Sequence, residues 1–155
     1  MIFVRDKIVE TMKAAFPEFG DNIRPYTGRF GELQDPAVSY TAQPALVVAA
    51  LPMIEAPKEV DPWPLQVNFG IVCMTKAARA SDADKLGWML ATQVGRIVYR
   101  NCWGFTRQME ITPAVIESIQ KQERLDERGI PTGVWYWTVL FHNYTTFDIV
   151  LRDPL

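Results

Sequence analysis

TGVWYWTVLFHNYTTF, residues Thr132–Phe147, predicts a β-strand near the end of the chain, because aromatic and β-branched residues follow one another without proline. Successive side chains of a strand point to opposite faces, so Trp135 and Trp137 share one face while Tyr136 and Tyr144 share the other. A small domain has few elements with which to cover two apolar faces. We therefore expect helices on one face, and loops or a second subunit on the other.

The length of 155 residues predicts a single domain, residues 1–155. A net charge of −2 gives no basic excess of the kind that binds nucleic acid. Cys73 and Cys102 have no short metal-binding spacing and are too few for a disulfide scaffold. No apolar run reaches the roughly 18 residues of a membrane span, so we expect a soluble, cytoplasmic protein with no membrane partner.

Hydrophobic periodicity predicts two helices and four strands. The expected helices are residues 2–16 and 81–102, and the expected strands are residues 44–51, 65–76, 114–122 and 132–147. In the second helix the expected stripe consists of Leu86, Met89, Leu90, Gln93, Val94, Ile97 and Val98. Two proline-rich loops, residues 17–44 and 52–64, separate the early elements, and the first has room for a short strand or turn of its own.

The order of these elements favours an α+β fold. Short links between consecutive strands favour antiparallel pairing. We expect a four-stranded, mostly antiparallel (mixed) sheet with two helices packed on one face, joined by long Pro/Gly-rich loops.

The sequence carries no recognisable catalytic motif. His142 is the single histidine, and no motif places a carboxylate or a nucleophile beside it, so we expect a structural role. Cys73 and Cys102 are expected to pack as small apolar residues. The glycines of the segment Tyr26–Leu33 lack the spacing of a phosphate-binding loop. We therefore expect no catalytic site, no cofactor, no metal site and no enzymatic activity.

Aromatic and arginine side chains on loops are candidates for a subunit interface, since such residues dominate interface energetics. The charged run of residues 121–128 has two interpretations: a solvated hairpin tip, or a charge patch that meets the same or another kind of subunit. The candidate interface residues are Tyr26, Arg29, Phe30, Trp63, Arg124 and Arg128.

The segments Pro44–Val48, Ala83–Val94 and Tyr136–Phe141 occur in an order that resembles the tail terminator proteins of long-tailed bacteriophages, of the Mu-like and lambda-like types. The resemblance covers most of the chain and consists of packing patterns. It implies a phage or prophage protein that forms a hexameric ring, caps the tail tube, stops its polymerisation and joins it to the head. The implied partners are the tail tube protein and head-completion or connector proteins, with DNA passing through the ring. The implied location is the virion tail, after assembly in the host cytoplasm.

Two other functions remain open. A head–tail connector, neck or tail-completion protein would have a similar size and an equal lack of catalytic motifs. A small-molecule-binding or enzymatic α+β domain would use a pocket formed by the aromatic strand around His142 and Tyr144.

Overall fold

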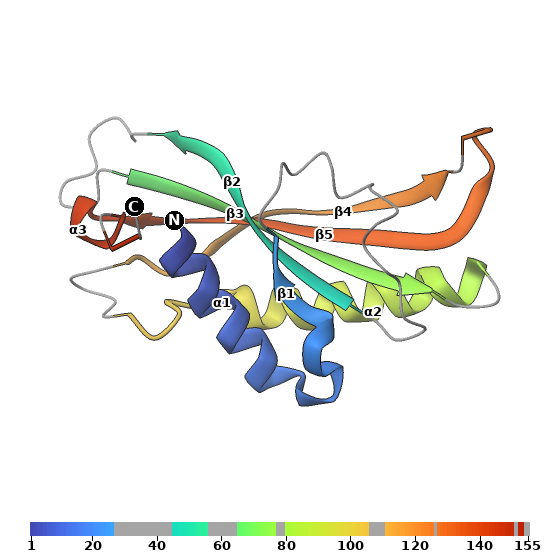
Figure 1. The fold of residues 1–155 in the computed structure, drawn as a ribbon, viewed down its shortest axis with the longest axis horizontal. Coiled ribbons are helices and arrows are strands. Elements are labelled where there is room, and N and C mark those ends of the chain that lie inside the picture. The colour runs from blue at the N-terminus through green and yellow to red at the C-terminus, as the bar shows by residue number, and fades with distance from the viewer. Residues whose placement is uncertain are drawn as a thin grey trace.

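A mixed β-sheet forms one layer of the protein and two helices form the other (Figure 1). The computed structural model describes residues 1–26, 45–55, 65–76, 80–105, 111–125, 127–150 and 152–153. In chain order the elements are α1 (Ile2–Ala15), the 3-10 helix η1 (Pro17–Asn22), β1 (Ile23–Pro25), β2 (Ala45–Glu55), β3 (Leu65–Lys76), α2 (Ala80–Val98), β4 (Val115–Leu125), β5 (Pro131–Thr145) and α3 (Phe147–Val150). The predicted α+β class is confirmed.

Within the described residues the sheet has five strands, in the order β1-β2-β3-β5-β4, where the sequence predicted four. The additional strand, β1, has three residues and pairs parallel with β2, so that Ile23 lies opposite Leu46. The other pairs are antiparallel, as expected. β1 lies in the first proline-rich segment, which was expected to have room for a short strand. The position of β1 is set by its pairing with β2, for which the local sequence gives no pattern.

β5 lies between β3 and β4 and carries the alternation that its sequence predicts. Val139 and Phe141 are buried on one face, where Phe141 stacks on Phe69 of β3 with ring centroids 5.7 Å apart. Tyr136 and Thr138, one position out of phase, lie on the opposite face. Both faces of β5 therefore carry buried side chains.

Both α1 and α2 cover the Phe141 face of the sheet (Figure 1). From α1, Val4, Ile8 and Met12 are buried in this core, at the spacing of one helical face. The predicted arrangement of two helices on one face is therefore what the structure has.

At its start α2 turns small residues toward the sheet, whereas its later turns bury the larger Leu90, Val94 and Val98, as predicted. At Gly87 an added Cβ would lie only 2.5 Å from Cδ1 of Trp137, so only glycine allows this close approach. Ala83, one turn earlier, is also fully buried. The prediction that Leu86 and Met89 belong to the buried stripe is wrong, because the close approach of α2 to β5 turns both of them outward.

The second face of the sheet carries a smaller cluster of buried side chains. Tyr26, just after β1, packs against this cluster. No helix among the described residues lies on this face (Figure 1). The proline-rich segments expected to cover it include residues 27–44 and 56–64, which lie outside the described residues. The cluster consists of Ala45, Val47, Val72, Met74 and Tyr136.

The two ends of the described chain meet (Figure 1). The carboxylate of Asp153 accepts hydrogen bonds from the backbone N–H of Ile2 at 2.9 Å and of Phe3 at 2.7 Å, and it also pairs with the Met1 amino group. Since α1 has no side-chain cap of its own, Asp153 fills that role from a distant part of the chain. Ile149 of α3 is buried beside this contact and fixes the C-terminal segment.

Candidate functional site

Only part of the predicted interface set lies within the described residues. Tyr26 is half-buried: its backbone N–H donates to the Val48 carbonyl at 2.8 Å, and its carbonyl accepts from Nη1 of Arg5 at 3.1 Å. These contacts hold Tyr26 within its own chain. Arg29, Phe30 and Trp63 lie outside the described residues.

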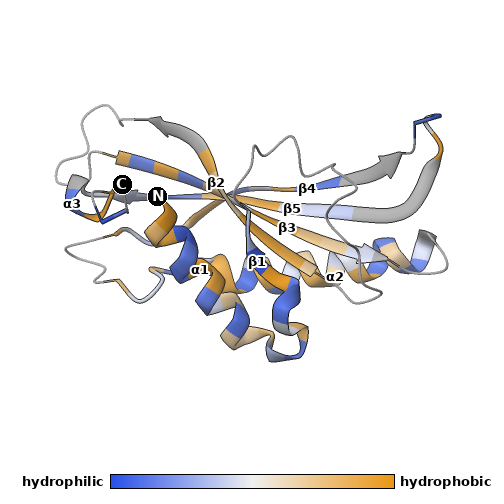
Figure 2. Ribbon diagram, viewed as in Figure 1, coloured by the Kyte–Doolittle hydropathy of each residue, from blue (hydrophilic) through white to orange (hydrophobic). Residues whose placement is uncertain are grey.

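The two predicted arginines lie near the β4–β5 hairpin tip. Arg124 belongs to β4, where the register shifts between Glu123 and Leu125, and its side chain lies outside what the structure describes. Arg128 is exposed in the turn, whose tip is hydrophilic in Figure 2. Ile130, in the same turn, has 54% of its surface exposed, a feature that the sequence interpretation did not single out.

The outer surface of α2 presents large apolar side chains that the sequence placed in the core or left unassigned. Leu86, Trp88 and Met89 are 47%, 51% and 48% exposed. Trp88 is partly supported by Trp137 of β5, with ring centroids 5.1 Å apart. Exposed residues of this size, gathered on one helix, are typical of a surface that meets another protein.

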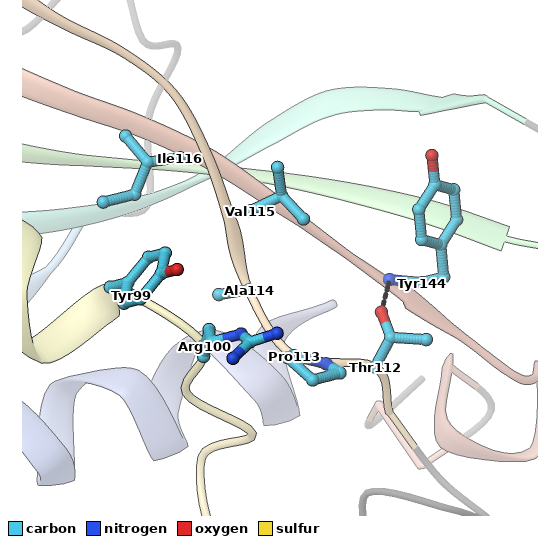
Figure 3. A pocket seen from close by; sticks show the side chains of 8 residues that line it. All are labelled: Tyr99, Arg100, Thr112, Pro113, Ala114, Val115, Ile116 and Tyr144. Carbon is cyan, nitrogen blue, oxygen red and sulfur yellow. Dashed lines mark hydrogen bonds between the residues drawn. The ribbon is translucent and has the colours of Figure 1, made fainter.

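A hollow of about 490 Å³ lies where the end of α2 meets the start of β4 (Figure 3). Its wall is mostly apolar, and among its lining residues Arg100 alone carries a charge. In Figure 3 the Arg100 guanidinium lies between the ring of Tyr99 and Pro113. Tyr99 and Val115 leave 64% and 49% of their surfaces exposed. The lining residues are Tyr99, Arg100, Thr112, Pro113, Ala114, Val115, Ile116 and Tyr144.

A buried hydrogen-bond network fixes the shape of this hollow. Asn143 of β5 is fully buried; its Oδ1 accepts from the Trp103 indole at 3.0 Å, and its Nδ2 donates to the Thr112 carbonyl at 2.7 Å. The Thr112 hydroxyl in turn accepts from the backbone N–H of Tyr144 at 2.8 Å. The segments on both sides of the hollow are therefore fastened to the same strand.

The backbone of Arg100 is set by the end of α2. Its φ of 59° lies in the left-handed region that commonly ends a helix. Its N–H donates to the Ala114 carbonyl at 3.1 Å, which ties the helix end to the residue just before β4. The guanidinium is thereby carried at the rim of the hollow.

The structure places a carboxylate beside His142, which corrects the expectation that none is near. Nδ1 of His142 lies 2.6 Å from Oε1 of Glu117, and the His142 ring meets Tyr144 edge-on with centroids 5.2 Å apart. Glu117 lies at a bulge of β4, between the paired residues Ile116 and Ser118. A bulge redirects a side chain, and no sequence motif marks this one.

Both cysteines are thiols that form no disulfide. Cys73 is fully buried in the core, as predicted, and burial raises the pKa of its thiol well above the usual range. Cys102 is half-buried and packs against the same core.

No protein-family model matches the chain, and no curated protein matches it in sequence. Within the described parts of the chain, no group of three or more histidine, cysteine, aspartate or glutamate residues is placed to hold a metal ion. None of the described helices is long and apolar enough to span a membrane.

Proposed function

We propose that this protein is a structural component of a long-tailed bacteriophage, a tail terminator that assembles as a hexameric ring. The ring would cap the tail tube, stop its polymerisation and provide the joint to the head. The proposal rests first on the resemblance of three ordered segments, Pro44–Val48, Ala83–Val94 and Tyr136–Phe141, to this family. It requires an α+β domain that offers more than one surface to other copies.

The observation that carries the proposal is the distribution of exposed apolar side chains. Among the described residues they gather on α2 at Trp88 and its neighbours and at the hollow with Tyr99 and Val115, while Ile130 at the hairpin tip and Ile2 of α1 are exposed singly. A ring that closes on itself uses a head-to-tail contact, in which each copy presents two different surfaces. The apolar patches on α2 and at the hollow, two different surfaces of one small domain, support such an assembly better than they support a monomer.

Electron microscopy of the purified protein tests this function. We expect annular particles with an open centre, and we expect them to bind the ends of cognate tail tubes and leave the sides bare. Particles without a central opening would contradict the proposal. Rings that bind a head connector but never a tube end would instead favour the neck or connector protein.

A second function, a small-molecule-binding or enzymatic domain, is favoured by one observation. His142, Glu117 and Tyr144 meet on the face of the sheet that no described helix covers, and Tyr144 also lines the hollow. A histidine held by a carboxylate is a common acid–base arrangement. Thermal-shift screening against metabolites would support this function if a compound raised the Tm of the wild type but not that of His142→Ala. Failure of every compound would favour the structural role.

A further inference from the structure

We propose that the hairpin tip between β4 and β5 of one copy inserts into the hollow beside Arg100 of the next copy, with Ile130 as the apolar anchor and Glu127 paired to Arg100. The inference rests on the proposed ring, and it names the two surfaces that would meet. Glu127 and Ile130 are both exposed.

The hollow and the hairpin tip lie at opposite ends of β4, so they can meet only if they belong to different copies. β4 begins at the hollow with Val115 and ends at the hairpin tip with Leu125. The eleven residues of β4 span roughly 33 Å at about 3.3 Å per residue. Figure 1 shows the β4–β5 hairpin extended away from α1, with its tip at the far end. The tip therefore cannot fold back into its own hollow, so a contact between tip and hollow joins two copies. In the proposed ring this contact would be repeated head to tail.

The chemistry of the two surfaces is complementary. The hollow offers the apolar side chains of Val115 and Ile116, whereas the tip offers Ile130. The single charge on the wall of the hollow is the guanidinium of Arg100, and Glu127 lies three residues before Ile130 in the tip. A guanidinium and a carboxylate form two parallel hydrogen bonds, which would fix the orientation of the inserted tip. Insertion would remove the exposed surfaces of Val115 and Ile130 from water together.

The hairpin tip is built to present these side chains. Gly129 has a φ of 75°, which allows the tight turn between Arg128 and Ile130. Arg128 is exposed beside Glu127, so the tip carries both signs of charge. From the sequence, one interpretation of the charged run of residues 121–128 is a patch that meets another subunit. In this proposal the residue of that run that meets the neighbouring copy is Glu127, rather than Arg124 or Arg128.

Charge reversal tests the pairing. We expect Arg100→Glu and Glu127→Arg each to weaken self-association by about tenfold or more, measured by sedimentation velocity over a range of concentrations. The double variant Arg100→Glu/Glu127→Arg should recover most of the association, because it restores the opposite charges. Arg24→Glu, an exposed change at the opposite edge of the sheet, is the matched control and should leave association unchanged.

Disulfide capture tests the contact directly. In a Cys102→Ser background, mixing Val115→Cys with Ile130→Cys should give a covalent dimer under oxidation, whereas either variant alone should not. If the charge-reversal variants associate as strongly as the wild type and no covalent dimer forms, this inference is overturned, but the proposal of a ring is not. A chain that stays monomeric at every concentration would overturn both.

Discussion

Replacing each of two glycines of α2 by alanine is expected to change the stability of the protein in opposite directions. Gly87 and Gly95 are both buried against the sheet, two turns apart on the same helix. Replacing either by alanine gains about 0.5–1 kcal/mol from helix propensity. The difference between them depends on what the new methyl group meets.

At Gly95 the added Cβ would lie 3.4 Å from Cδ1 of Ile119, an ordinary contact, so Gly95→Ala should stabilise the protein by about 0.5–1 kcal/mol. At Gly87 the Cβ would lie 2.5 Å from Cδ1 of Trp137 and 3.0 Å from Oγ1 of Thr75. The indole must move, and overpacking of this kind costs about 1–3 kcal/mol. Gly87→Ala should therefore be the less stable variant, by about 1–3 kcal/mol.

This difference is measured by urea unfolding of the wild type and both variants, monitored by circular dichroism. The protein concentration is chosen so that a single oligomeric state is present. The m-values should be equal, so that the midpoints alone report stability. Equal stability of the two variants, or a more stable Gly87→Ala, would refute the described packing of α2 against β5.

Three further predictions concern the core and the termini. Asn143→Ala should lower the free energy of unfolding by on the order of 3 kcal/mol in urea melts, because it leaves the Trp103 N–H and a carbonyl buried without partners, whereas unchanged stability would contradict the network. Asp153→Ala should cost about 1 kcal/mol in the same assay through loss of the α1 cap, and no change would show that the cap is dispensable. A thiol reagent at pH 8 should modify Cys102 in the native protein and Cys73 only after unfolding, as peptide mass spectrometry would show; native modification of Cys73 would contradict its burial and raised pKa.

Local patterns in the sequence were enough to predict most of the fold. The alternation in β3 and β5 and the apolar stripe of α1 report which side chains are buried, because a strand repeats every two residues and a helix about every 3.6. The pattern in α2 was predicted in part: Leu90, Val94 and Val98 are buried as expected, but Leu86 and Met89 are exposed. Near the start of the helix the sheet instead favours Ala83 and Gly87, since Trp137 already fills the space beneath Gly87.

The site features were harder to predict because they depend on pairings between distant residues. Glu117 meets His142 only because a bulge shifts the register of β4 against β5. The hollow depends on Asn143 holding the segment around Thr112, a contact between residues 31 positions apart. Alternation along β5 predicts which face each residue occupies, but it carries no information about which residue on another strand will lie opposite.

The molar mass of the purified protein, measured by light scattering across a range of concentrations, tests the proposed ring most directly. We expect a closed species of six 17.7 kDa chains whose mass does not rise further with concentration. A single 17.7 kDa species at every concentration, or a mass that grows without limit, would contradict it.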